Sequence, residues 1–195
     1  MMQSNLSDQE LVHNYLNGDN TSFEVLVYRH KRKVYTSIIM LVKDPSLADD
    51  IFQDTFIKVI DKLHEKKYKD EGKFLAWVIR IGHNLVIDHF RKEKHFTMIR
   101  DTEEYNVFDR IDLLENSAQD NMEIKQTEKQ LQELIDELPY EQKEVLILRH
   151  YCKMSFKDIA ATTHVSINTA LGRMRYALIH LRKLIEDRNL DFFDR

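Results

Sequence analysis

Glycine, proline and cysteine are all scarce in this chain of 195 residues, which contains four, two and one of them respectively. Because glycine and proline form turns and interrupt helices, their scarcity predicts an all-helical (all-α) protein, as does the near absence of alternating apolar and polar residues. The single cysteine excludes an internal disulfide framework and fits a reducing compartment. No apolar run approaches the roughly 18 residues that cross a membrane, and the first residues are not those of a signal peptide. We therefore expect a cytoplasmic protein.

The residue groupings of common catalytic and metal sites are also missing from the sequence. We find no nucleophile constellation, no glycine-rich phosphate loop and no cluster of metal ligands. His83, His89 and His95 are spaced six residues apart, so they do not share a helix face on which a metal could bind. We predict that the chain is not an enzyme and that it has no catalytic residue, metal or cofactor.

Charge is abundant and unevenly distributed, although the formal net charge is only -4. Segment 101–141 holds thirteen acidic and three basic residues, whereas segment 142–183 holds eight basic and two acidic residues. Segment 80–100 is basic as well, with five basic and two acidic residues. Two basic segments separated by an acidic one suit a polyanionic partner better than the net charge suggests.

Residues 155–184 have the pattern of a helix-turn-helix. Ser155 can cap a short helix, residues 162–165 break it, and Ser166 can cap a longer second helix. In such motifs the N-terminal residues of the second helix reach base edges in the major groove of DNA. Here they are short polar groups followed by guanidinium groups, which suit bases and phosphates: Asn168, Thr169, Arg173 and Arg175. An ordinary antiparallel helix pair with a solvated face remains the alternative at this point.

The first half of the chain predicts amphipathic helices over about 8–16, 21–42 and 47–63. The third of these has an apolar stripe for the core and, on the opposite side, a compact second face. That face combines two acids, an amide and an apolar residue at spacings of three, four and seven: Asp50, Gln53, Asp54 and Ile57. It is either a partner-binding face or a solvated surface. A metal or acid–base pair is disfavoured because no histidine or cysteine stands at ligand spacing.

Residues 73–95 predict an apolar stripe that includes Trp77, followed by a break at 82–84 that exposes a loop. Beyond the break, the polar and charged residues Asp88, Arg91, Lys92 and His95 lie on one side of a further helix. Residues 97–119 are acidic and polar without sustained periodicity, which is typical of a linker. A last domain begins near residue 122.

Taken together, these segments resemble the small extracytoplasmic-function (ECF) sigma factors of bacterial RNA polymerase, which belong to the sigma-70 family. The stretches that carry the resemblance are 23–28, 47–56, 74–77, 80–84, 88–92, 138–139, 145–149, 156–160 and 168–184. The resemblance implies two small helical domains joined by an acidic linker at 97–121. Domain 1–96, an N-terminal helical bundle, would bind polymerase and open the promoter at the minus-ten element. Domain 122–195, with the helix-turn-helix, would recognise the minus-thirty-five element.

The same resemblance implies a role for each surface. The Asp50–Ile57 face would bind the clamp helices of the beta-prime subunit of core RNA polymerase. The expected loop at Asn84 would capture a flipped base of the minus-ten element, with Asp88 nearby and Arg91 and Lys92 on the strand backbone. The linker would pass through polymerase channels built for nucleic acid. The second helix of the motif would read duplex promoter DNA through Ser166, Asn168, Thr169, Arg173, Arg175 and Tyr176.

One stretch departs from the family pattern. After Thr169 the family often has valine, a basic residue, serine and arginine, and here Ala170, Leu171 and Gly172 precede Arg173. A basic contact is lost at Leu171, and Gly172 weakens the helix by about 1 kcal/mol relative to alanine. Either the promoter element differs, or Arg175 and Tyr176 replace the lost contact. At Lys157 a basic residue stands where an acidic one is usual.

The sequence thus favours a sigma factor that directs promoter-specific transcription initiation by core polymerase. The alternative is a self-sufficient, dimeric helix-turn-helix regulator, which needs only the C-terminal motif. An anti-sigma factor is a further candidate partner.

Overall fold

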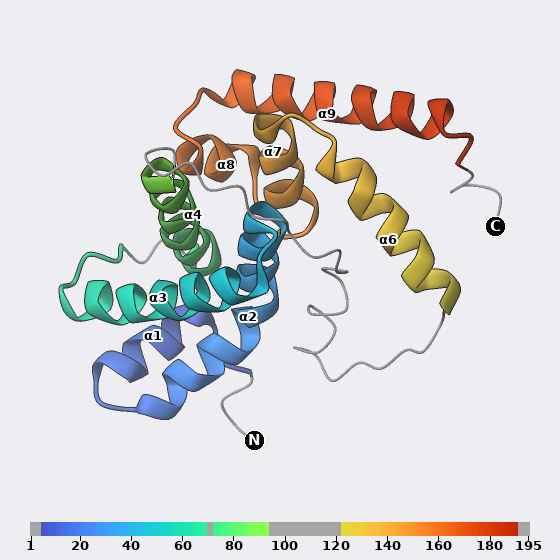
Figure 1. Cartoon of the computed structure of the whole chain (residues 1–195). Coiled ribbons are helices and arrows are strands. Elements are labelled where there is room, and N and C mark those ends of the chain that lie inside the picture. Colours follow the sequence, from blue (N-terminus) through green and yellow to red (C-terminus); the bar gives the residue numbers. More distant parts are fainter. Residues whose placement is uncertain (1–4, 70–71, 94–121, 191–195) are drawn as a thin grey trace. The chain divides into compact units, whose positions relative to one another are not determined.

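The structure is a computed structural model that describes residues 5–69, 72–93 and 122–190. These residues form eight helices and no strand (Figure 1). The chain divides into two compact units, one within residues 1–102 and the other within 103–195. The predicted all-helical fold with two helical units is therefore confirmed, while the predicted linker at 97–121 lies wholly outside the described residues. No described helix is both long and apolar enough to cross a membrane.

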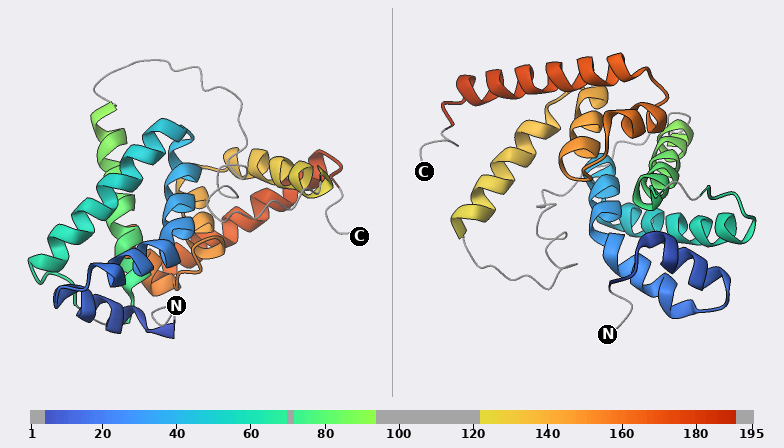
Figure 2. Two further views of the ribbon diagram at one scale, coloured as in Figure 1. Left: turned by 90° about the horizontal axis from the view of Figure 1, so that it is seen from below. Right: turned by 180° about the vertical axis from the view of Figure 1, so that it is seen from behind.

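The described residues of unit 1 form four helices, which are arranged around the second of them. They are α1 (Asp8–Leu16), α2 (Asn20–Val42), α3 (Pro45–His64) and α4 (Phe74–Glu93). Helix α2 contacts α1, α3 and α4, and α3 also packs against α4, as the views in Figure 2 show. Side-chain caps begin the first three helices: the backbone amides of Glu10, Thr21 and Leu47 donate to Ser7, Asp19 and Asp44.

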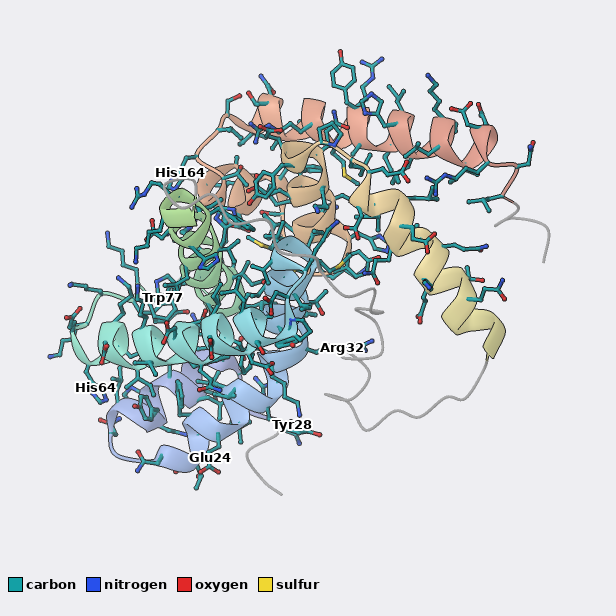
Figure 3. All side chains as sticks on the ribbon, in the orientation of Figure 1. Glu24, Tyr28, Arg32, His64, Trp77 and His164 are labelled. Atoms are coloured by element: carbon teal, nitrogen blue, oxygen red, sulfur yellow. The ribbon has the colours of Figure 1, made fainter. Side chains whose placement is uncertain are left out.

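The core of unit 1 is mainly apolar and receives buried side chains from all four helices. Its fully buried large side chains include Leu11, Leu26, Ile38, Ile39, Leu63, Phe74 and Ile79. The lone Trp77, labelled in Figure 3, is half-buried. The centroid of its ring lies 4.7 Å from that of Tyr68 and 6.0 Å from that of Phe74. Asp8 ties α1 to α2, because its carboxylate lies 2.7 Å from Arg29 Nη1 and 2.8 Å from His30 Nε2.

The expected break at residues 82–84 is wrong, because α4 runs without interruption from Phe74 to Glu93. Gly82 is buried inside this helix, where a Cβ atom would lie 3.1 Å from Thr55 Oγ1 and 3.5 Å from Ile38 Cδ1. Glycine is therefore used here for a close approach of α4 to its neighbours. Tertiary packing of the helix on both sides of Gly82 outweighs the low helix propensity of one glycine, which is about 1 kcal/mol.

Unit 2 contains α6 (Met122–Asp136), α7 (Tyr140–His150), α8 (Phe156–Thr162) and α9 (Ile167–Asp187). Helix α9 packs on α6, α7 and α8, and its C-terminal half extends beyond α8 (Figures 1 and 2). The core combines the buried apolar side chains of all four helices, among them Leu134, Ile147, Leu148, Ile159, Ala170 and Ala177. This arrangement holds the N-terminal turns of α9 on a rigid support.

Candidate nucleic-acid interface and partner surface

Helices α8 and α9 form the predicted helix-turn-helix, and both serine caps are confirmed. The Asp158 amide donates to Ser155 Oγ at 3.2 Å, and the Thr169 amide donates to Ser166 Oγ at 3.0 Å. Between the helices the chain turns at His164, whose φ is 56°, and the Val165 amide donates to the Ala160 carbonyl at 3.0 Å. A side chain with a Cβ atom disfavours this left-handed conformation, so the turn is held by the packing of the two helices.

One face of α9 packs on the unit and the other is open to solvent. Ala170, Ala177 and Leu181 are buried at spacings of seven and four residues. Among the residues of the helix-turn-helix predicted to contact DNA, five are exposed: Ser166, Asn168, Thr169, Arg175 and Tyr176. The Ser166 hydroxyl also lies 2.8 Å from Thr169 Oγ1, so these two side chains form one polar group at the start of the helix.

Arg173 is directed differently from the other predicted contacts. Its Nη1 atom lies 3.7 Å from Oε2 of Glu144 on α7, and the Glu144 side chain is only 5% exposed. Burial, together with the Glu144 charge, raises the pKa of nearby Tyr140, which keeps that hydroxyl neutral. The structure therefore places the Arg173 guanidinium where it balances a buried carboxylate, and this fixes α9 on α7.

A basic hollow at the C-terminal end of α7 was not identified from the sequence. It is lined by Arg149, His150, Lys153 and Met174. Arg149 Nη1 donates to the Met154 carbonyl at 2.8 Å, and its guanidinium lies over the Phe156 ring. Burial and the charge of Lys153 lower the pKa of His150, so the positive charge at neutral pH comes from the arginine and the lysine. The sequence signal was the basic character of segment 142–183, which carries no information on where the side chains meet.

The predicted partner face on α3 is present as a connected surface. Asp50, Gln53, Asp54 and Ile57 are all exposed, and Ile57 is 56% exposed. The opposite side of the helix carries the buried residues Ile51, Thr55, Phe56 and Val59. A single exposed aliphatic side chain among carboxylates and an amide fits either a partner-binding face or a solvated surface, so the partner role of this face stays a prediction.

A further exposed aromatic side chain was not identified from the sequence. Tyr28 projects from α2 and is 71% exposed, with Lys31 Nζ 4.3 Å from the ring centroid (Figure 3). The helical pattern alone did not distinguish it from the neighbouring core positions.

The C-terminal half of α4 presents a polar edge. Asn84, Asp88, Arg91 and Lys92 follow one another at spacings of four, three and one, so they share one side of the helix. Asn84, Arg91 and Lys92 are exposed, and Arg91 Nη2 lies 3.0 Å from Asp88 Oδ1. Asn84 thus belongs to a helix face and not to a loop, which corrects the geometry expected for this group.

Both units of the chain match families of known proteins. The model of Sigma-70 region 2 matches residues 26–96, and that of Sigma-70, region 4 matches residues 128–181. The chain is 26% identical to the RNA polymerase sigma-H factor of Pseudomonas aeruginosa over 171 residues, which cover 86% of this chain and 88% of that protein. It is 25% identical to the ECF RNA polymerase sigma-E factor of Haemophilus influenzae over 192 residues, 96% of this chain and 97% of that protein.

The fold is similar to a solved structure of the sigma factor RpoE from Bartonella quintana, in complex with the anti-sigma factor NepR. The TM-score is 0.64 at 19% sequence identity, and the match covers 90% of this chain and 99% of that one. Both units thus have counterparts of known fold.

Proposed function

The chain belongs to the sigma-70 family as an ECF sigma factor, and from this premise we propose how its surfaces direct promoter-specific transcription initiation. It binds core RNA polymerase through region 2, and it recognises the minus-ten element through region 2 and the minus-thirty-five element through region 4. The polymerase carries out the chemistry, so the chain itself is no enzyme, and it acts in the cytoplasm. Residues 1–96 and 122–195 are the two functional domains, with 97–121 as their connector.

The observation that carries this proposal is the exposed N-terminal half of α9 within a complete helix-turn-helix. Serine caps fix both helices, and the buried Ala170 and Ala177 hold α9 on its support. Asn168 and Arg175 then project from the open side. An amide suits adenine and a guanidinium suits guanine or phosphate, so this face can read base pairs in the major groove. Arg173 positions the helix through Glu144.

The α3 face supplies the contact with polymerase. Asp50 and Asp54 offer carboxylates to basic residues of the beta-prime clamp helices, and Ile57 supplies the apolar centre. A self-sufficient DNA-binding regulator has no use for this face. The match of region 2 over residues 26–96 therefore favours the sigma factor over that alternative.

The polar edge of α4 contacts the minus-ten strand. Arg91 and Lys92 bind the backbone, and Asp88 and Asn84 lie about one and two turns earlier, respectively, on the same side, where they can meet an unstacked base. This contact uses a helix face that is already formed, so no loop has to be ordered on binding.

An anti-sigma factor is a further proposed partner. Support comes from the similarly folded RpoE, which was solved in complex with one. Coexpression of the chain with proteins encoded beside it, followed by purification, tests whether such a partner binds.

Reconstitution with core polymerase tests the proposed function. Core enzyme from the host bacterium, with and without the chain, transcribes a library of random promoter fragments, and transcripts are sequenced. The proposal predicts start sites that need the chain and share two spaced elements. Absence of chain-dependent start sites would refute it, and specific binding of an operator by the chain without polymerase would favour the alternative.

A further inference from the structure

Two exposed aliphatic side chains lie on the face of α9 that is suited to enter the major groove. Ile167 is 45% exposed and Leu171 is 43% exposed, and Arg175 follows one turn later. Residues spaced by four lie above one another on a helix, so these three form one row. Asn168 and Gly172 form the neighbouring row, one residue further along. The face therefore combines polar base-reading groups with an apolar strip.

An apolar strip gains nothing from phosphates or from most base edges. The apolar group that duplex DNA offers in its major groove is the 5-methyl group of thymine. Leu171 extends from the second turn of α9, within the N-terminal region of a recognition helix that approaches the bases. A leucine at this depth can bury a thymine methyl group and remove both from water.

Gly172 provides a second, independent observation at the same place. No atom lies within 4 Å of the position that a Cβ atom would occupy, so the glycine is not required by packing inside the unit. A glycine inside a helix lowers its stability, and here no internal contact explains the cost. Gly172 is half-buried, and because it has no side chain its backbone permits a closer approach of a ligand than any other residue would allow.

We propose that Leu171 reads a thymine in the upstream promoter element by contact with its 5-methyl group, and that Gly172 lets α9 approach the base pair closely enough for this contact. Ile167 extends the apolar surface on the N-terminal side. Asn168 and Arg175 bind the neighbouring base edges or phosphates. The inference rests on the proposed function, since it needs α9 to lie in the groove of the upstream element.

Selection of promoters by the holoenzyme provides the first step of the test. Duplexes with a randomised upstream region are enriched by transcription with the wild-type holoenzyme and with holoenzymes carrying Leu171→Ala or Leu178→Ala. Leu178 is a matched control, because it is 48% exposed and lies two turns further along α9. We expect the wild type and Leu178→Ala to select the same thymine, and Leu171→Ala to lose the preference at that single position.

Deoxyuridine provides the second step, because it differs from thymidine only by the missing methyl group. Replacing the selected thymine by deoxyuridine should lower the affinity of the wild-type holoenzyme about fourfold, the effect of burying one methyl group. The Leu171→Ala holoenzyme should bind both duplexes equally. Gly172→Ala should weaken binding to both duplexes.

The outcomes separate this inference from the proposed function. If an upstream element is enriched but Leu171→Ala retains its preference, or if deoxyuridine is tolerated by the wild type, the inference is overturned and the proposed function stands. If the wild-type holoenzyme enriches no element, the proposed function fails and the inference with it.

Discussion

Gly172 and Gly82 offer a matched pair of substitutions whose effects on stability should have opposite signs. Both glycines lie inside helices, so alanine at either position gains about 1 kcal/mol of helix propensity. At Gly172 the added methyl group meets no atom within 4 Å, and the gain should appear in full. We expect Gly172→Ala to stabilise unit 2 by about 1 kcal/mol and to raise its melting temperature by about 4–8 °C.

At Gly82 the same methyl group would lie 3.1 Å from Thr55 Oγ1 and 3.5 Å from Ile38 Cδ1. Thr55 is fully buried and its hydroxyl donates to the Ile51 carbonyl at 2.7 Å, so this neighbour cannot easily move away. Overpacking of this kind costs about 1–3 kcal/mol, which exceeds the gain in propensity. We expect Gly82→Ala to destabilise unit 1 by about 1 kcal/mol.

The single tryptophan allows both predictions to be measured in the full chain. Trp77 lies in unit 1, so its fluorescence follows the unfolding of that unit, while far-UV circular dichroism follows both units. Gly82→Ala should lower the denaturation midpoint measured by fluorescence. Gly172→Ala should raise the midpoint measured by circular dichroism and leave the fluorescence midpoint unchanged. In a Thr55→Ala background, Gly82→Ala should become stabilising. A Gly172→Ala chain of unchanged or lower stability, or a Gly82→Ala effect that persists without Thr55, would refute the reasoning.

Three further predictions concern a surface, an ion pair and a turn. Ile57→Ala should weaken polymerase binding by about five- to tenfold, because the exposed half of an aliphatic side chain is no longer buried on binding. Leu16→Ala is the control, since Leu16 is 45% exposed on α1, and it should leave the affinity unchanged. Equal effects of the two substitutions in a titration with labelled core enzyme would argue against the α3 interface. Asp8→Asn should cost about 1–3 kcal/mol in urea unfolding at neutral pH. Burial alone would raise the pKa of Asp8, but His30 and Arg29 together lower it below the ordinary 3.8. The carboxylate should therefore contribute to the free energy of unfolding above pH 3.8, and this contribution should vanish as the pH falls through the folded-state pKa. A stability difference between Asp8→Asn and the wild type that persisted at the lowest pH would contradict this account. His164→Gly should stabilise unit 2 by about 0.5 kcal/mol through relief of the left-handed backbone, and a loss of thermal stability would show that the imidazole itself contributes.

Features that depend on local chemistry were predictable from the sequence. The residues that follow Ser155 and Ser166 predict both serines as caps, and both accept the expected backbone hydrogen bonds. The exposed group on α3 follows from helical periodicity, because burying a face with two carboxylates and an amide would cost their hydration. Such features can be predicted because the groups that interact lie within one helical turn of each other in the sequence.

Features that depend on contacts between helices were not predictable. Gly82 was interpreted as a helix break because the sequence does not show that Thr55 and Ile38 face it across the interface. The pairing of Arg173 with Glu144 is equally hidden from the sequence, because it requires α7 and α9 to be packed, while the DNA contact of Arg173 stays a prediction. Both residues have neighbours that only the tertiary structure shows.

Footprinting on a promoter that depends on this chain tests the central claim most directly. With the chain alone, the account predicts little or no protection of the promoter. With core polymerase added, it predicts protection of two spaced elements and thymines that become reactive to permanganate in the downstream one, where the duplex opens. Strong protection of a palindromic site by the chain alone, unchanged by polymerase and without reactive thymines, would contradict the account.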